Sequence, residues 1–303
     1  MRIIHHPGYD PHFGQQHVFP SVKFQKVRDR LLGDATASEA DLLRPDPATN
    51  DDLLLVHTPA WVDALTHGTL THAQIVRLEV PYSQAMVRAF RLMAGGSILA
   101  AQIALEDGVA YNCGGGFHHA FAGHGEGFCA VNDVAVAIRV LQRAGRIQRA
   151  MVIDCDVHHG NGTAAVFADD PSVFTVSLHQ FKNYPAVKPP SNIDVHLNNG
   201  TGDADYLDIL HRLCHRAMAD FTPQLVFYVA GADPYENDQL GGLSLTLDGL
   251  RDRDRVVISA ARQRKIPVAV TLAGGYAEQL EDTVSIHAAT AQVACSVAAG
   301  SFR

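Results

Sequence analysis

Hydrophobic residues along this chain form short apolar runs that are separated by longer amphipathic stretches. The short runs have the length and composition of strands buried on both faces of a sheet. They cover Arg2–His5, Leu53–His57, Val109–Cys113, Ala150–Cys155, Val173–Leu178, Leu225–Ala230 and Pro267–Leu272. Because helical patterns lie between most of these runs, we expect right-handed crossovers and a mainly parallel central sheet with helices on both faces. This is a three-layer α/β fold.

Capping residues mark the ends of the predicted helices. One helix is expected over Ser83–Asp107, with the serine as its N-cap and Gly108 just past its end. Thr58 and Pro59 are a second start signal, and Gly68 is the matching stop. Further helices are predicted over Val131–Gln142, Asp203–Ala219, Thr246–Arg262 and Glu278–Ala298.

The composition is that of a globular protein, with 47% hydrophobic and 18% charged residues. No repeat or linker divides the chain, so we predict a single domain over residues 1–303. The formal net charge of −8 disfavours direct nucleic-acid binding. Since no segment has the ~18 apolar residues of a membrane helix, we expect a cytoplasmic protein without membrane attachment. The five cysteines form no CxxC pair and are expected to be reduced thiols.

Polar side chains gather where three of the predicted strands end. Asp154, Asp156 and His158 follow one strand, and strand alternation would place them on the same face. Two other strand ends supply Asp233 and Tyr276. In a parallel sheet these ends border the crevice in which ligands bind.

The carboxylates at this edge require a compensating cation if they are buried. A buried ion-pair network is the alternative, but no basic residue lies in these motifs. We therefore predict a metal ion on Asp156, His158 and Asp233 with an open coordination position, as in catalytic sites. Zinc suits these ligands, and ferrous iron or cobalt would also fit. His118 and His119, in a glycine-rich loop, are candidates for proton transfer.

The ordered segments GGGFHHA, GFCAVND, IDCDVHHGNG, VSLH, AGADPYENDQLGGLSLT and LAGGY resemble the motif series of the histone deacetylase family. The resemblance covers nearly the whole chain, and it is greatest to the class IV type and its bacterial relatives. It implies an arginase/deacetylase-like fold and the zinc-dependent hydrolysis of N-acyl-lysine, carrying an acetyl or longer acyl group. The substrate would be an acyl-lysine peptide or protein, or another acylated amine.

The resemblance also implies roles for individual residues. His119 would act as general base and then acid, His118 would orient it, and Tyr276 would donate its hydroxyl to the oxyanion. Asp154 would pair with His118. Substrate binding would involve Gly127 and Phe128 in the channel wall and Glu79 at the substrate backbone. A structural potassium ion would be held at Asp154, Asp156, His158, Ser177 and Leu178.

Two positions depart from the more common family pattern. Asn161 stands where class I members carry an aspartate that pairs with the second histidine of the dyad. This substitution predicts a less basic His119. The segment LAGGY replaces the more common GGGY next to the oxyanion donor.

Other functions and other sites are less consistent with the sequence. A dimanganese ureohydrolase would need more carboxylates to bridge two ions, and an acyl-lysine binder without turnover would not need Tyr276 and His119. An acetylpolyamine amidohydrolase stays open as an alternative. His211 and His215 have helical spacing but lack the glutamate of HExxH, and they are predicted on a solvated face. The run LRDRDRVV is likewise predicted to be the exposed side of a helix.

Overall fold

The computed structural model describes residues 1–14 and 17–300. Its centre is an eight-stranded sheet in which every pairing is parallel, with the order β2-β1-β3-β8-β7-β4-β5-β6. The strands are β1 (Ile3–Ile4), β2 (Leu42–Leu43), β3 (Val109–Asn112), β4 (Ala150–Asp154), β5 (Val173–Gln180), β6 (Ile193–Leu197), β7 (Leu225–Val229) and β8 (Val268–Thr271). The parallel sheet predicted from the apolar runs is therefore confirmed.

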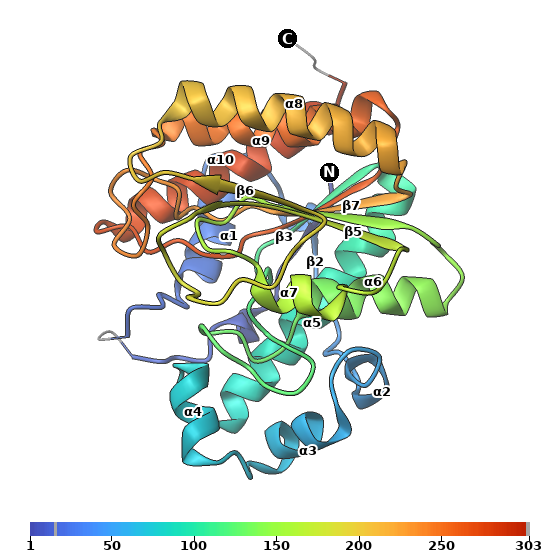
Figure 1. Ribbon diagram of the computed structural model, residues 1–303, viewed down its shortest axis with the longest axis vertical. Coiled ribbons are helices and arrows are strands. Elements are labelled where there is room, and N and C mark those ends of the chain that lie inside the picture. Colours follow the sequence, from blue (N-terminus) through green and yellow to red (C-terminus); the bar gives the residue numbers. More distant parts are fainter. Residues whose placement is uncertain (15–16, 301–303) are drawn as a thin grey trace.

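Helices cover both faces of this sheet, which gives the predicted three layers (Figure 1). Helices α1, α8, α9 and α10 pack together on one side, and α5, α6 and α7 on the other, with α2 to α4 beyond α5. Their bounds are α1 (Lys23–Gly33), α2 (Asn50–Leu53), α3 (Pro59–His67), α4 (His72–Leu78), α5 (Gln84–Asp107), α6 (Asp133–Arg143), α7 (Asn161–Val166), α8 (Asp203–Phe221), α9 (Leu247–Gln263) and α10 (Leu280–Ala298). No helix in the described ranges is long and apolar enough to span a membrane.

The capping signals of the sequence operate as predicted. The Ser83 side chain accepts a hydrogen bond from the backbone of Met86 at the start of α5, and Gly108 caps its end with a φ of 89°. At α3, Thr58 caps the first turn and Gly68 ends the helix in the left-handed conformation. Local chemistry therefore fixes where these helices begin and end.

The predicted strand at Leu53–His57 is wrong. Thr49 and Asp52 form a capping box that starts the short helix α2, and Leu53 is its last residue. The following residues form a turn, in which the ring of His57 hydrogen-bonds to Phe121 O. An apolar run of this length does not distinguish a strand from a buried turn of helix. Strands β2 and β6 and helices α1, α4 and α7 were not predicted.

The run LRDRDRVV is not simply the exposed side of α9, because Arg253 and Asp254 are 0% and 1% exposed. The Arg253 guanidinium pairs with Asp254 Oδ1 at 2.8 Å and also donates to the Gly231 and Cys155 carbonyls. Asp254 accepts a further hydrogen bond from the Tyr228 hydroxyl. A charged pair can be buried here because its hydrogen bonds are satisfied.

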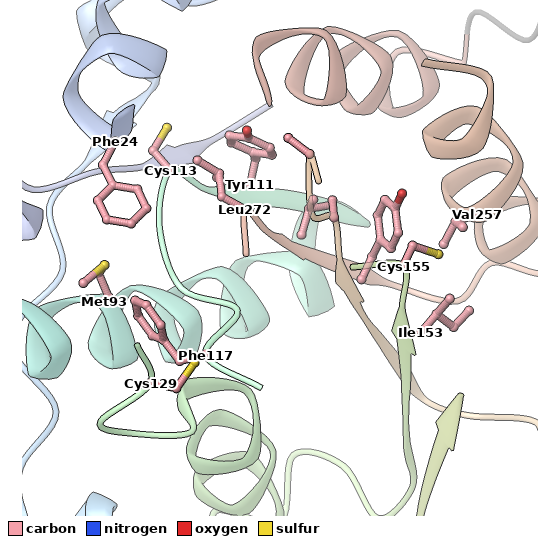
Figure 2. Close-up of a cluster of buried hydrophobic side chains, with 14 of the residues drawn as sticks. Phe24, Met93, Tyr111, Cys113, Phe117, Cys129, Ile153, Cys155, Val257 and Leu272 are labelled. Carbon is pink, nitrogen blue, oxygen red and sulfur yellow. The ribbon is translucent and has the colours of Figure 1, made fainter. Parts of the chain in front are cut away.

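The main core lies between the sheet and its helices and includes aromatic, aliphatic and thiol side chains from many elements (Figure 2). Figure 2 shows Tyr111, Cys155 and Leu272 near the sheet, and Met93 with Phe117 below it. All five cysteines are free thiols. Strands β4, β7 and β8 are buried at every position. The carboxyl ends of these strands therefore open into a largely desolvated region.

Candidate metal centre

The residues that follow β4 lie in a bend and not in the strand itself. The strand ends at Asp154, so strict strand alternation does not carry Asp156 and His158 to one face as predicted. Instead, Asp154 Oδ1 accepts from Asp156 N at 3.1 Å, and Asp156 Oδ1 accepts from His158 N at 2.9 Å. These side-chain-to-backbone hydrogen bonds stabilise the bend, which brings the polar side chains together.

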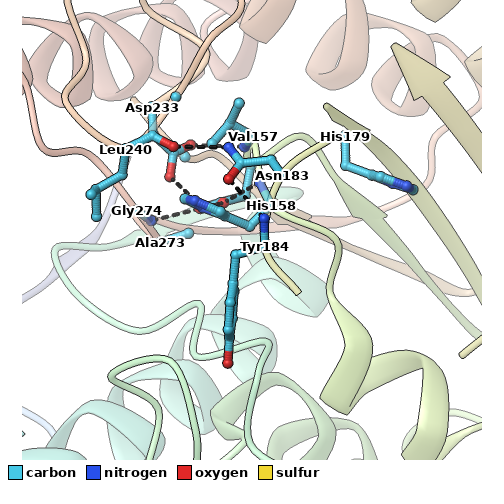
Figure 3. A network of polar contacts seen from close by, with 12 residues as sticks. Val157, His158, His179, Asn183, Tyr184, Asp233, Leu240, Ala273 and Gly274 are labelled. Atoms are coloured by element: carbon cyan, nitrogen blue, oxygen red, sulfur yellow. Dashed lines mark hydrogen bonds and ion pairs between the residues drawn. The ribbon is translucent and has the colours of Figure 1, made fainter. Parts of the chain in front are cut away.

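Asp156, His158 and Asp233 meet at the ends of β4 and β7. Each offers one ligand atom, and the three atoms lie within 4.8 Å of one another. His158 Nδ1 is 3.0 Å from Asp156 Oδ1 and 3.3 Å from Asp233 Oδ2. Figure 3 shows the side chains of His158 and Asp233 pointing toward each other above the backbone of Gly274.

Two glycines leave room for this cluster. A Cβ atom on Gly274 would lie 1.9 Å from Asp233 Oδ2, and a Cβ on Gly231 would lie 2.6 Å from Asp156 Oδ2. The same close approach lets Gly274 N donate to Asp156 Oδ2 at 2.8 Å. Both glycines were in the quoted motifs, but their contact with the carboxylates is visible only in three dimensions.

The electrostatics of the cluster suit a cation. Asp156 and Asp233 are 1% and 0% exposed, and burial together with the charge of Asp156 raises the pKa of Asp233. Burial alone would lower the pKa of His158, but the two adjacent carboxylates, Asp156 and Asp233, raise that pKa to about 10. Asp233 Oδ2 has no hydrogen-bond partner within the described part of the chain. A metal ion would satisfy this oxygen and neutralise the carboxylates, so the residues present fit the ion.

Lys23 is a cation near this site that the motifs did not reveal. It is 0% exposed, and its ammonium donates to Ala273 O at 2.7 Å, next to Gly274. Burial lowers its pKa to about 8, although Asp233 and Asp156 act in the opposite direction. No basic residue lies in the motifs themselves, but the fold brings Lys23 close to the site. The Lys23 ammonium donates to a carbonyl oxygen, however, and so does not supply the missing partner of Asp233 Oδ2.

The tandem histidines lie beside the cluster. His118 Nδ1 is 2.7 Å from Asp154 Oδ2, and its Nε2 is 3.1 Å from His119 Nε2. Burial would lower the pKa of His118, but Asp154 and Asp156 raise it to about 9. Burial and the neighbouring His118 and His158 lower the pKa of His119. The two adjacent rings therefore differ in basicity because they have different partners.

Asn161 connects His119 to a carboxylate that sequence reasoning missed. Its Nδ2 donates to Glu126 Oε1 at 2.6 Å, and its Oδ1 lies 2.7 Å from His119 Nδ1. Since a carboxylate only accepts, the amide must present its NH₂ group to Glu126 and its oxygen to His119. His119 then carries its proton on Nδ1, and Nε2 is left as the basic nitrogen. The Tyr184 hydroxyl also donates to Glu126 Oε1, at 3.2 Å.

A narrow pocket leads to these residues, with a cavity volume of about 20 Å³. Gly127, Phe128 and Tyr276 form part of its wall, together with Phe19. The Phe128 ring lies 5.9 Å from that of Tyr276 and 5.7 Å from that of Phe19, measured between centroids. A Cβ on Gly127 would come within 2.7 Å of the His119 ring, which explains the glycine. The structure thus brings the two predicted channel residues to the pocket.

The remaining predicted residues lie outside this pocket. Glu79 ends α4 in the left-handed conformation, and its side chain is exposed. Partial burial and Glu126 raise the pKa of Glu79, so the two carboxylates lie in one region. Ser177 is the register partner of Asp154 across β4 and β5, and its hydroxyl hydrogen-bonds to His179. Leu178 is buried next to it in β5. Potassium binding stays a prediction.

Asp238 is a further residue that the sequence did not single out. One of its carboxylate oxygens accepts from Tyr276 N at 2.6 Å, and the other accepts from Leu240 N and Gly241 N at 2.9 Å. It thereby ties the loop after β7 to the loop after β8. This carboxylate therefore holds the backbone of Tyr276 in position.

The sheet and the cluster define a class of protein: a three-layer parallel α/β fold with carboxylate and imidazole side chains that could hold one ion at the strand ends. Residues 17–292 match the family model described as Histone deacetylase domain. The chain therefore belongs to the histone deacetylase family.

Individual relatives agree with this assignment. The chain is 35% identical to Histone deacetylase 2 of Arabidopsis thaliana, over 91% of this chain and 74% of the relative. It is 29% identical to the acetoin utilization protein AcuC of Bacillus subtilis, over 86% and 73% of the two chains. Among solved structures, the HDA15 HD domain superposes with a TM-score of 0.81 at 25% identity, covering 99% of this chain and 91% of that one.

Proposed function

We propose that this protein is a zinc-dependent deacylase that hydrolyses the amide bond of N-acyl-lysine, releasing the free amine and a carboxylate. Family membership supports the reaction class. The observation that carries the proposal is the buried cluster of Asp156, His158 and Asp233, which has an unsatisfied carboxylate oxygen. Asp156 and His158 of this cluster line the narrow pocket. A zinc ion held there would polarise the amide carbonyl and lower the pKa of water from 15.7 to about 7. Ferrous iron would fit the same ligands.

In this proposal the histidines divide the proton transfers. His119 is the general base, because Asn161 accepts from its Nδ1–H and leaves Nε2 as its basic nitrogen. It then returns the proton to the leaving amine. His118 is hydrogen-bonded to Asp154, whose charge favours the protonated form of the ring. The separation of the two pKa values is what gives the adjacent rings different roles.

Tyr276 is proposed as the donor to the oxyanion. Its ring lines the pocket, and Asp238 fixes its backbone nitrogen. By analogy with other oxyanion donors, the loss of its hydroxyl would cost about 2.7–4 kcal/mol, or 10²–10³ in kcat. Ala273 replaces the first glycine of the more common GGGY at a φ of 60°, and its carbonyl accepts from Lys23.

The shape and charge of the pocket favour a slim substrate with a cationic remainder. The aromatic wall of Phe128, Phe19 and Tyr276 suits an extended aliphatic chain. Glu79 and Glu126 place negative charge in the same region outside the narrow part. An acyl-lysine within a basic peptide fits this arrangement, and so does an acylated polyamine, which is the second candidate. We also propose that Asp154, Asp156, His158, Ser177 and Leu178 surround a structural potassium ion.

The test is a steady-state assay of the zinc-loaded enzyme on acyl-lysine peptides of graded acyl length and on acetylpolyamines. We expect turnover that is abolished by EDTA and restored by zinc. His119→Ala and Tyr276→Phe should lose at least about 10²-fold in kcat. His211→Ala, on the exposed face of α8, is the control and should retain full activity. If both active-site variants match the wild type, the proposed mechanism is wrong.

A further inference from the structure

A second group of metal-ligand side chains lies on the outer part of the sheet, where β5 pairs with the edge strand β6. In the register of these strands, Ser177 is opposite Asp194 and His179 is opposite His196. Because side chains alternate along a strand, the histidine and its partner two residues earlier share a face on each strand. Two neighbouring cross-strand pairs therefore place Asp194, His179 and His196 together.

His159 completes this group from the loop after β4. Its Nε2 lies 3.0 Å from Asp194 Oδ1, and its ring centroid lies 4.6 Å from that of His179. One ligand atom each from His159, His179 and Asp194 lies within 4.8 Å of the others. The Nδ1 atom of His196 lies 2.9 Å from His179 Nε2 and adds a fourth donor. Three imidazoles and one carboxylate are thus assembled by three separate segments.

This group is separate from the candidate zinc ligands. His158 and His159 are consecutive, but His158 contacts Asp156 and Asp233, whereas His159 contacts Asp194. Figure 3 shows His179 well to the side of His158 and Asp233, with its ring directed away from them. The two sets of ligands share no residue.

We infer that His159, His179, Asp194 and His196 form a second binding site for a divalent transition-metal ion, which fastens the loop of residues 181–192. Imidazole and carboxylate together favour zinc, cobalt, nickel or copper over calcium or magnesium. His159 and His179 are both 0% exposed, whereas Asp194 is partly exposed and His196 is exposed. The site therefore has a rigid inner half and an outer half through which an ion can enter. The Ser177 hydroxyl, 2.9 Å from His179 Nδ1, would accept from that ring when Nε2 binds the ion.

The position of the site gives it a structural role. The loop 181–192 leaves β5 just after His179 and re-enters β6 just before Asp194. Its residue Tyr184 packs against His119, with ring centroids 5.0 Å apart, and donates to Glu126. An ion bound at both ends of the loop would hold the wall of the active site in place. Without the ion, the hydrogen bonds among the same side chains would tie the strands less tightly.

To test this, the protein is loaded with zinc or cobalt and dialysed. The number of bound ions per chain is then measured by inductively coupled plasma mass spectrometry. We expect two ions for the wild type, one for Asp233→Ala, and one for the double variant His179→Ala/His196→Ala. The double variant His211→Ala/His215→Ala removes two histidines from the exposed face of α8 and should still bind two. Two ions in the wild type and none in Asp233→Ala would instead indicate a binuclear centre and overturn the inference.

Two further measurements distinguish the loss of the second ion from misfolding of a variant. His196→Ala removes only an exposed ligand, and it should weaken the second ion at least about tenfold while the circular dichroism spectrum is unchanged. Hydrogen exchange of residues 181–192 should slow when the second ion is added to a chain that already holds the first. A wild type that binds one ion, lost in Asp233→Ala, would disprove the second site without affecting the proposed deacylase. Equal exchange with and without the ion would disprove its role in the loop.

Discussion

Replacing Glu126 tests whether a carboxylate two side chains away orients the proposed general base. In the wild type, Glu126 accepts from Asn161 Nδ2 at 2.6 Å, and Asn161 Oδ1 lies 2.7 Å from His119 Nδ1. Glu126→Ala would leave the Asn161 amide without its acceptor. The amide could then rotate and present its NH₂ group to His119, which would favour the wrong tautomer.

The magnitude follows from the type of hydrogen bond that is lost. A hydrogen bond to a charged group contributes about 1.5–3 kcal/mol, which corresponds to a decrease of about 10- to 150-fold in kcat if the whole effect reaches the transition state. Glu126→Gln retains one oxygen acceptor but no charge, and should lose about 2- to 10-fold. KM should change little on an acetyl-lysine peptide whose other residues are uncharged, because Glu126 does not line the narrow pocket within the described residues.

The assay measures kcat and KM separately on an acetyl-lysine peptide for both Glu126 variants. Glu236→Ala is the control, since this glutamate is exposed and lies outside the hydrogen-bond chain from Glu126 through Asn161 to His119. A graded loss in kcat, larger for alanine than for glutamine, is expected. If Glu126→Ala retains kcat within about twofold, Asn161 does not depend on Glu126 and the reasoning fails.

Two other predictions concern stability. Arg253→Ala should lower the free energy of unfolding by about 3–5 kcal/mol in urea titrations, because it leaves Asp254 buried without its partner. Arg255→Ala breaks only an exposed pair and should cost less than about 1 kcal/mol; similar losses in the two variants would contradict this. Burial lowers the pKa of His57 to about 4, so the unfolded chain binds more protons between about pH 6.5 and 4, and stability falls on acidification. The stability advantage of the wild type over His57→Gln should therefore shrink by about 1.4 kcal/mol per pH unit in that window, and a constant difference would refute it.

Local sequence signals predicted most of the helices and strands, because the start and end of such an element depend mainly on residues that are close together in the chain. Apolar runs gave β3, β4, β5, β7 and β8, and capping residues gave the bounds of α3 and α5. Strand β6 was missed because only Leu197 in it is buried, so it lacks an apolar run. Helix α1 was missed because Val22 supplies no side-chain cap at its start. The error at Leu53–His57 has the same origin, since a short apolar segment is compatible with more than one conformation.

The candidate site, like the fold, has one part that the sequence predicted and another that it did not. The sequence by itself determined the ligand types and their order, since Asp156, His158 and Asp233 follow buried strands whose parallel ends must meet at one edge. Only the tertiary structure decided which residues from distant segments contact the site residues and so affect their charge or orientation. Lys23 and Glu126 lie outside the quoted motifs and reach the site through contacts between segments far apart in the chain. Such contacts depend on distances of a few ångströms between side chains far apart in the chain, and periodicity carries no information about them.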